Sequence, residues 1–143
     1  MKETMVIKTN HLTEDEKKIR EEVFMMEQGF QSEFDDIDSI ATHLVFYEAE
    51  QPIAACRYYQ GEEEGLFWLG RIAVQKTFRG KHIGKQIVLA AEKEIRKEGG
   101  KQVQLSAQVR AKEFYEKCGY RAVGEIYLDE DCPHVCMNKA LEN

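Results

Sequence analysis

A short segment in the middle of the chain combines glycine with basic residues and could bind phosphate groups. Gly80 and Gly84 let the backbone approach a ligand closely, and Arg79, Lys81 and Lys85 place positive charge around them. A helix that begins in such a loop presents unpaired N–H groups and the positive end of its dipole to an anion. The segment fits neither the P-loop spacing nor the GxGxxG spacing. It predicts a polyanion-binding loop, with an ordinary strand-to-helix turn and solvated lysines as the alternative.

A strand and a helix must hold this loop in place. Leu66–Val74 is rich in apolar residues and is predicted to be a strand. Beyond Gly84 the apolar residues follow a helical stripe, and the polar residues between them are expected to face solvent. The apolar stripe consists of Ile83, Ile87, Val88, Ala91 and Ile95, and the solvent face of Lys85, Glu92, Lys93 and Arg96.

The loop resembles a known cofactor-binding motif. The sequence RGKHIG at Arg79–Gly84 fits the pattern Arg/Gln-x-x-Gly-x-Gly/Ala, the pyrophosphate loop of GCN5-related N-acetyltransferases, the GNAT family. His82 departs from the pattern, because the family usually has its first motif glycine there. The preceding LGRIAV is similar to the family's fourth strand, whose backbone holds the pantetheine arm of coenzyme A. The resemblance therefore implies that acetyl-CoA contacts Ile72, Ala73, Val74, Arg79, Gly80, Lys81, His82, Ile83, Gly84 and Lys85.

A second stretch, Gln108–Tyr120, strengthens the resemblance. It is similar to the GNAT segment Asn-x-x-Ala-x-x-Phe/Leu-Tyr-x-x-x-Gly-Phe, with Gln108 in place of the asparagine that contacts the pantetheine arm in many members. Phe114 and Tyr115 match the aromatic pair, which the resemblance assigns to the cofactor site. Tyr115 falls on the tyrosine that often protonates the departing thiolate; the alternative is a tyrosine that only packs. Two motifs in the right order are more specific than either alone.

The resemblance implies a fold and an activity. Val23–Gln28 and Cys132–Met137 look like the ElaA/YjcF-like subgroup of the family. The implied fold is α/β (α+β): a mixed, mostly antiparallel sheet with helices on both faces and splayed fourth and fifth strands. The implied activity is transfer of an acetyl group from acetyl-CoA to an amine of a small molecule or protein by direct attack. A non-catalytic acyl-CoA-binding or sensing module and a nucleotide-phosphate binder are the alternatives.

The general base is not evident from the sequence. Some GNAT members carry a glutamate on the fourth strand, but Leu66–Val74 contains no carboxylate. Glu27, His43 and His134 are the remaining candidates. His43 opens a predicted strand and could equally be a partly exposed sheet-end histidine, and Glu27 could be a solvated surface residue.

A metal site is not expected at the C-terminal cysteines. Cys132, His134 and Cys136 would line one face of a strand, but three alternating positions span ~13 Å, too far to converge on one ion. We therefore predict that no metal is bound.

The most acidic stretch, Gln31–Ser39, has two interpretations. Glu33, Asp35, Asp36 and Asp38 could form a solvated loop or a negative rim that attracts a cationic amine. Arg57, in a predicted strand, could bind an anionic group of the acceptor or form an internal ion pair.

Length and composition limit the remaining options. The 143 residues predict one domain, 1–143, and the net charge of -6 disfavours a nucleic-acid partner. No run approaches the ~20 apolar residues of a membrane span, so we expect a cytoplasmic protein with reduced cysteines. The expected partners are acetyl-CoA and an amine acceptor, with a homodimer as an option.

The remaining apolar segments predict the other elements of the fold. The other predicted strands are Met5–Lys8, His43–Glu48, Ile53–Gln60, Val103–Ala107, Arg121–Val123 and Val135–Lys139. Two further helices are predicted: one starts with the Thr13–Glu16 capping box and ends near Gly29, and the other is Ala111–Lys117.

Overall fold

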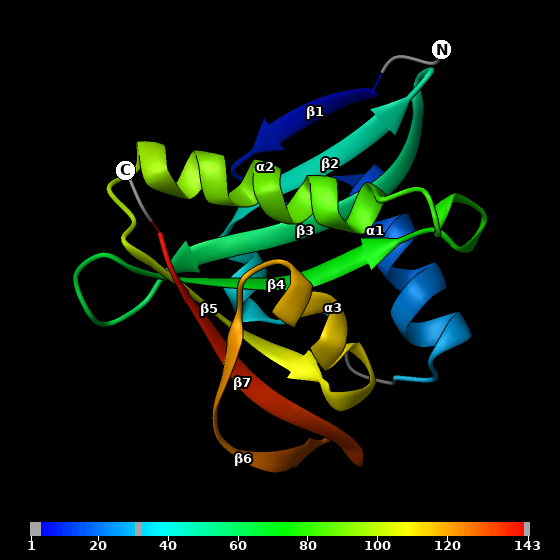
Figure 1. Ribbon diagram of the computed structural model, residues 1–143. Coiled ribbons are helices and arrows are strands. Elements are labelled where there is room, and N and C mark those ends of the chain that lie inside the picture. The colour runs from blue at the N-terminus through cyan, green and yellow to red at the C-terminus, as the bar shows by residue number, and fades with distance from the viewer. Residues whose placement is uncertain (1–3, 31–32, 142–143) are drawn as a thin grey trace.

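A seven-stranded sheet forms the centre of the computed structural model, which describes residues 4–30 and 33–141 (Figure 1). The strand order is β1-β2-β3-β4-β5-β7-β6; β4 and β5 run parallel, and the other neighbours pair antiparallel. The predicted mixed, mostly antiparallel sheet is therefore confirmed. The strands are β1 (Thr4–Thr9), β2 (Thr42–Glu48), β3 (Gln51–Gln60), β4 (Leu66–Val74), β5 (Gln102–Gln108), β6 (Arg121–Asp129) and β7 (Cys132–Ala140).

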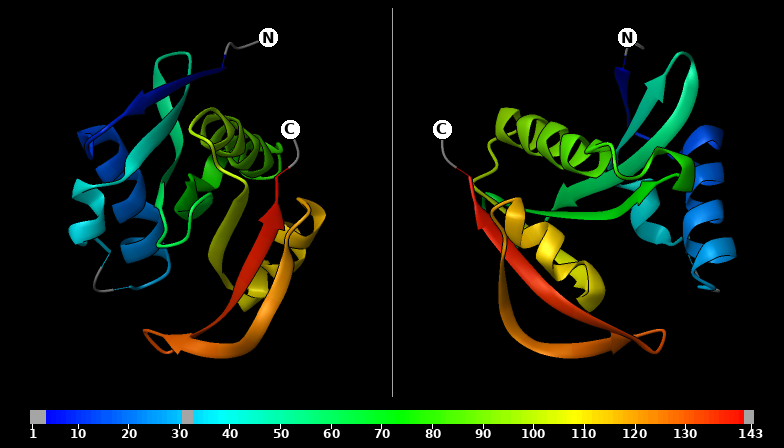
Figure 2. Two further views of the ribbon diagram at one scale, coloured as in Figure 1. Left: turned by 90° about the vertical axis from the view of Figure 1, so that its left-hand side faces the viewer. Right: turned by 45° about the vertical axis from the view of Figure 1, so that its right-hand side comes forward.

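Helices cover both faces of this sheet (Figure 2). On one face lie α2 (Ile83–Lys97) and α3 (Lys112–Lys117); on the other lies α1 (Glu14–Arg20), which continues as a π-helix, η1 (Glu21–Glu27). Within the described ranges, no helix is both long and apolar enough to cross a membrane. Three short 3-10 segments complete the elements: η2 (Asp36–Ser39), η3 (Lys76–Phe78) and η4 (Val109–Ala111).

Alternation along the central strands builds two apolar layers. In β2, Leu44 and Phe46 pack toward α2 while Val45 packs toward α1. In β3, Cys56 packs toward α2 and Ala55 packs toward α1. Successive strand side chains point to opposite faces, so a strand buried on both faces reads as a continuous apolar run.

The first helix differs from its predicted pattern. Thr13 caps it as expected, since its hydroxyl accepts a hydrogen bond from the Glu16 amide. On α-helical spacing, Met26 shares the apolar face of Ile19 and Val23, and Arg20 lies away from it. In the structure, however, Met26 is 80% exposed and Arg20 is fully buried. The π-helix after Arg20 has more residues per turn than an α-helix, which shifts the phase of the stripe and turns Met26 outward.

Glu92 in α2 is also buried, although the pattern predicted it on the solvent face. It accepts hydrogen bonds from the Tyr120 hydroxyl at 2.9 Å and from the Lys139 ammonium at 2.9 Å. The helix is therefore enclosed on a side that its own sequence marks as polar, because the connection between α3 and β6 and the strand β7 bring partners for the carboxylate.

The two parallel strands separate partway along their length. β4 pairs with β5 from Leu66–Trp68 to Gln102–Gln104, and beyond that point the strands diverge (Figure 1). The β3–β4 ladder is irregular near the same level, where Arg71 has a φ of 51°. The predicted splay of the fourth and fifth strands is thus confirmed, and it opens a gap at the centre of the sheet.

Candidate acyl-transfer site

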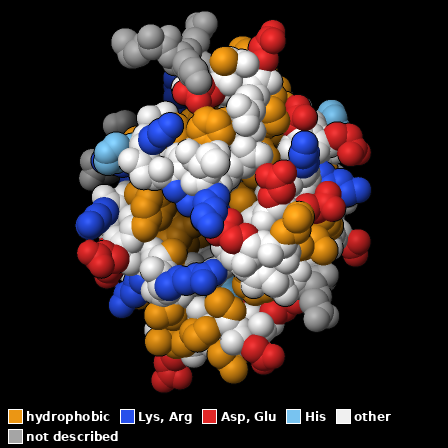
Figure 3. All heavy atoms as spheres, turned by 90° about the vertical axis from the view of Figure 1, so that its right-hand side faces the viewer, with side chains coloured by type: hydrophobic (Ala, Val, Ile, Leu, Met, Phe, Trp, Pro, Cys, Tyr) orange, Lys and Arg blue, Asp and Glu red, His pale blue; other side chains and the backbone are white. Residues whose placement is uncertain are grey.

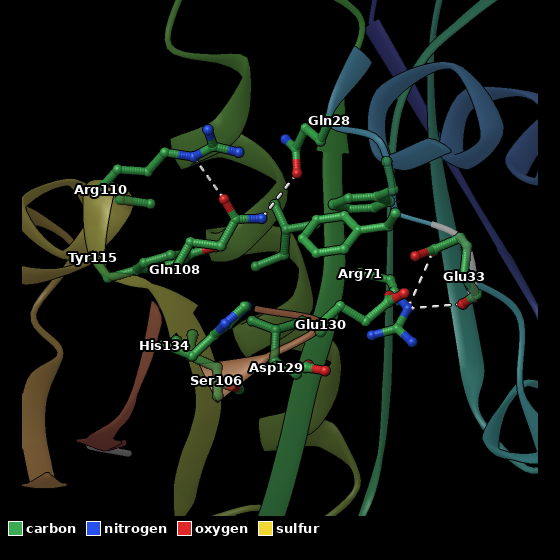
Figure 4. Close-up of a pocket in the computed structure, with 17 residues that line it drawn as sticks. Gln28, Glu33, Arg71, Ser106, Gln108, Arg110, Tyr115, Asp129, Glu130 and His134 are labelled. Carbon is green, nitrogen blue, oxygen red and sulfur yellow. Dashed lines mark hydrogen bonds and ion pairs between the residues drawn. The ribbon is translucent and has the colours of Figure 1, made fainter. Parts of the chain in front are cut away.

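A cavity of about 250 Å³ lies between the separated ends of β4 and β5. Its walls come from β4, β5, the end of η1, the η4–α3 segment and the turn between β6 and β7 (Figure 4). On the molecular surface this side is hollowed, with apolar side chains inside and Lys or Arg side chains beside them (Figure 3). The site therefore draws on both halves of the chain.

The loop between β4 and α2 has the conformation of an anion cradle. Gly80 has a φ of +79°, a conformation that glycine adopts without strain. The amide of Gln86 donates to the His82 carbonyl at 3.1 Å, so the amides that precede it at the start of α2 are outside the helical ladder. Lys81, His82 and Lys85 are exposed around this helix start. This geometry suits the oxygens of a pyrophosphate.

His82 explains why glycine is usual at its position in the motif. It occupies the N-cap of α2 with a φ of 63° and a ψ of 17°, in the left-handed region. Glycine adopts this conformation freely, whereas a residue with a Cβ is strained there by the order of 1 kcal/mol. Histidine in place of glycine therefore adds strain at this position, although the backbone still adopts the left-handed conformation.

Glu27, one of the three candidate bases, is paired with Arg79 from the same loop. The two Arg79 Nη atoms lie 2.5 and 2.8 Å from the Glu27 carboxylate oxygens, and Arg79 Nε donates to the Val74 carbonyl at 2.9 Å. The hydrogen bond from Arg79 lowers the pKa of Glu27, which makes its carboxylate a weaker base. Its contacts tie η1 to the loop at a place outside the cavity lining.

The aromatic pair predicted from the second motif lies beside the cradle. A Cβ placed on Gly84 would lie 3.2 Å from the Phe114 ring, so the glycine lets α2 and α3 approach. Tyr115 contacts Phe114 edge-on, with 5.0 Å between ring centroids, and lines the cavity. Burial raises the pKa of Tyr115, so its hydroxyl stays protonated at neutral pH. Gln108 also lines the cavity and donates to Gln28 Oε1 at 2.9 Å.

His134 is the candidate base that reaches the cavity. It lies on β7 opposite Gln108 of β5, is 6% exposed, and stacks on Tyr127 at 6.1 Å. Its Nδ1 lies 2.8 Å from the Cys132 carbonyl, which can only accept, so Nδ1 carries the proton. In a neutral ring Nε2 is then a lone-pair acceptor, and the ring is directed into the cavity (Figure 4).

His43 lies elsewhere, and the prediction that it acts as the base is corrected. It is fully buried between Glu16, at 2.8 Å from Nδ1, and the Asp38 carbonyl, at 2.9 Å from Nε2. Both partners are acceptors, so both ring nitrogens must donate and the ring is an imidazolium. Burial favours the neutral ring, but the hydrogen bonds from His43 to Glu16 and to the Asp38 carbonyl outweigh it and raise the pKa of His43. A buried, positively charged imidazole cannot accept a substrate proton.

Glu33, Asp35 and Asp38 of the acidic stretch are ion-paired, so they form neither a solvated loop nor a free negative rim, whereas Asp36 is exposed. Arg20 bonds to Glu33 at 2.7 Å and to Asp38 at 2.8 Å, and Arg57 bonds to Asp38 at 2.8 Å and Asp35 at 2.6 Å. Arginines from α1 and β3 thus supply the partners that local sequence lacked, and Arg57 forms an internal ion pair. Four cations, Arg20, Arg57, Arg71 and His43, meet four carboxylates, Glu16, Glu33, Asp35 and Asp38; we call these eight residues the ionic cluster.

The ionic cluster also contains the metal-ligating geometry found among the described residues. Ligand atoms of Glu16, Asp38 and His43 lie within 4.8 Å of one another. Arg20 bonds to both carboxylates, and His43 donates through both nitrogens, so cations and protons already occupy this site. The arrangement favours ion pairing over metal binding.

Charged residues of the cavity wall that sequence reasoning missed include Arg71, Asp129 and Glu130. Arg71 lies within the LGRIAV stretch, and the other two end the β6–β7 hairpin, whose first strand is longer than predicted. An arginine in an otherwise apolar strand was the available signal for the first. The other two carry no local signal, since acidic residues are common in turns.

Comparison with known families defines the class of this protein. The family described as acetyltransferase (GNAT) domain matches residues 9–141. The chain therefore belongs to the GNAT acetyltransferase family, as the two motifs predicted. Members of this family are acyltransferases that use an acyl-CoA donor.

Individual relatives agree with this assignment. The chain is 35% identical over 138 residues to the uncharacterized N-acetyltransferase YjcF of Bacillus subtilis, covering 94% of this chain and 97% of that protein. It is 26% identical to protein ElaA of Escherichia coli over 125 residues, covering 84% and 82% of the two chains. A crystal structure of an acyl-CoA N-acyltransferase from Pseudomonas aeruginosa matches with a TM-score of 0.83 and 28% identity, covering 98% of this chain and all of that one. The predicted similarity to ElaA and YjcF is thus confirmed.

Proposed function

We propose that this protein is an acetyl-CoA-dependent N-acetyltransferase that acts by direct attack of an amine on the thioester. The observation that carries the proposal is the meeting of Tyr115 and His134 in one cavity, between separated strands and beside an anion cradle. An acid for the leaving group and a base for the nucleophile are the two groups that this reaction needs. They come from α3 and β7, both of which pack against β5 on one side of the gap.

The cofactor would bind along β4 and the cradle. Its pyrophosphate would accept hydrogen bonds from amides in the segment Arg79–Lys85, with Lys81 and Lys85 nearby as counter-charges. Its pantetheine arm would run beside Ile72–Val74, where β4 has left its pairing with β5 and has backbone groups facing the gap. Gln108 lies across the gap on β5, Phe114 lies beside Gly84, and both would contact the same arm.

The proton balance of the reaction follows from these positions. An alkyl ammonium has a pKa near ~10 and must lose a proton before it can attack. Nε2 of His134 would take that proton; the amine nitrogen would bond to the acetyl carbon as the thioester bond breaks. An N–H of β4 would polarise the carbonyl oxygen. The leaving thiolate would take the proton of the Tyr115 hydroxyl, and the proton that the acylated nitrogen still has to lose would return to that phenolate. Because the amine attacks the thioester directly, no acyl-enzyme is required.

A screen of amine acceptors with acetyl-CoA, with CoA binding measured by calorimetry, tests this proposal. His134→Gln should retain acetyl-CoA affinity within ~3-fold and lower kcat by ~10²-fold, and the rise of rate with pH should flatten. His11→Gln, an exposed histidine outside the cavity, is the matched control and should keep the wild-type rate.

The same data separate the enzyme from a sensing module. Tight acetyl-CoA binding with no turnover of any amine would favour the non-catalytic alternative. The lack of a carboxylate on β4 and the strained His82 are the features that support it.

A further inference from the structure

Charged groups of opposite sign lie on two walls of the cavity. Arg71 lies on the β4 wall, and Asp129 and Glu130 lie at the tip of the β6–β7 hairpin (Figure 4). His134 follows that tip on β7 and is 6% exposed, with its ring directed into the space between them. A ligand in this cavity therefore meets a guanidinium on one side and two carboxylates with a buried imidazole on the other.

Arg71 is held in a fixed orientation. The Arg71 backbone has a φ of 51° where the β3–β4 ladder is irregular. Its Nε lies 3.1 Å from a Glu33 carboxylate oxygen, and its Nη2 donates to Asp35 at 3.3 Å. Those contacts use Nε and Nη2, and Nη1 is the nitrogen that they leave for a ligand. The side chain is 29% exposed, against 0% for Arg20 and 4% for Arg57 in the same ionic cluster, so Arg71 is the arginine of the cluster that a small molecule can reach.

The net charge of the cavity limits which acceptors fit. The four cations and four carboxylates of the ionic cluster balance, and the other charged side chains of the cavity lining are Arg110, Asp129 and Glu130. A ligand with two charges of one sign would therefore meet a charge of that sign on one of the walls. A diamine would place a second ammonium against Arg71, and a simple anion would meet Asp129 and Glu130. A net-neutral zwitterion places a charge of the favourable sign at each wall.

We propose that the acceptor is a small amino acid or a similar zwitterion, whose carboxylate binds Arg71 and whose amine lies between the hairpin tip and His134. This inference rests on the acetyltransferase activity proposed above and names its substrate class. Guanidinium groups match carboxylates in geometry and charge, which is why a fixed arginine selects for them. Asp129 and Glu130 attract the ammonium, and the imidazole accepts its proton before attack.

The test compares matched acceptors on one enzyme sample. A panel of amino acids is assayed with acetyl-CoA beside the corresponding decarboxylated amines and carboxamides. The expected result is a kcat/KM at least ~10²-fold higher for the best amino acid than for its decarboxylated amine, because only the former pairs with Arg71. The ratio of two acceptors does not depend on the fraction of folded enzyme, so it remains valid for a destabilised variant.

Arg71→Gln is the decisive variant, and Arg110→Gln is its control. Arg110 also lines the cavity, but its Nε donates to Gln108, away from the hairpin tip. Arg71→Gln should reduce the ratio to below ~5-fold, and Arg110→Gln should retain it. Equal or better turnover of the decarboxylated amines, or a ratio unchanged in Arg71→Gln, would overturn the zwitterion inference and leave the acetyltransferase intact. Failure of every amine in the panel, with acetyl-CoA bound, would overturn both.

Discussion

The two sides of the cavity satisfy their charged groups in opposite ways. On the side of the cradle, Lys81 and Lys85 are exposed, and the first amides of α2 point outward without helical partners. On the other side, Arg20 and its carboxylates are buried, and each is bonded to several oppositely charged neighbours. The first arrangement leaves groups available to a ligand that comes and goes. The second fixes the shape of the wall from which Arg71 projects.

This difference has an energetic consequence. Exposed charges contribute little to stability because water and salt screen them. A buried charge is costly unless it is paired, so the loss of one partner leaves the other unsatisfied. Substitutions on the buried side should therefore change stability, and those on the cradle side should change binding or rate.

The largest effect is expected for Arg20→Met. The substitution leaves Glu33 and Asp38 buried without their main cation and should lower the free energy of unfolding by about 3–5 kcal/mol. Lys117→Met is the control, because Lys117 pairs with Glu113 at 3.6 Å and is 77% exposed; it should change stability by less than ~0.5 kcal/mol. Urea denaturation measures both. A loss below 1 kcal/mol for Arg20→Met would show that the ionic cluster is not a stabilising unit.

On the cradle side of the cavity, Tyr115→Phe should change only the rate of acetyl transfer. Removing the hydroxyl takes away the proposed proton donor, so kcat should fall by ~10²-fold while acetyl-CoA affinity changes by less than ~3-fold. Tyr47→Phe is the control, because the Tyr47 hydroxyl bonds to Asp15 at 2.6 Å on the surface. Steady-state kinetics with chemistry limiting provides the measurement. Wild-type turnover in the Phe variant would make Tyr115 a packing residue.

His43 should make the contribution of the ionic cluster to the free energy of unfolding depend on pH. The folded state raises the pKa of His43, so its contribution to stability is complete below the unfolded pKa of ~6.5 and is lost as pH rises through the folded value. The free energy of unfolding should therefore decline with rising pH above neutrality in the wild type. The corresponding slope should be smaller in His43→Gln. Parallel curves for the two proteins, measured by denaturation across pH 6–10, would contradict the imidazolium assignment.

The smallest effect is expected for His82→Gly, which tests strain on the cradle side. Glycine removes the left-handed strain at a φ of 63° and should stabilise the protein by up to ~1 kcal/mol, less the added flexibility of its unfolded chain. His11→Gly replaces an exposed histidine that lies outside the positive-φ positions, so it should be neutral or destabilising. Thermal unfolding compares the two. A loss of stability in His82→Gly equal to that in His11→Gly would mean that the loop carries no strain.

The sequence by itself determined the strand-loop-helix segment that forms the anion cradle. Gly80, Gly84 and the helical stripe that follows are local features, and local periodicity together with backbone freedom decides how a strand-loop-helix segment folds. The position of Tyr115 beside the gap could be predicted for a similar reason, since its motif lies on one short helix a fixed distance beyond β5. The family, the mixed sheet and the splayed strands followed from these segments.

Only the tertiary structure decided the buried ionic cluster and the cavity wall that it supports. Arg20, Glu33 and Asp38 are polar residues that a linear pattern assigns to solvent, and they are buried because α1, the acidic stretch and β3 converge from separate parts of the chain. Long-range partners also determine which of the three candidate bases lines the cavity: His134 does, and Glu27 and His43 do not. An ion pair between residues distant in sequence leaves no periodicity to detect, and its free energy depends on burial that exists only after folding.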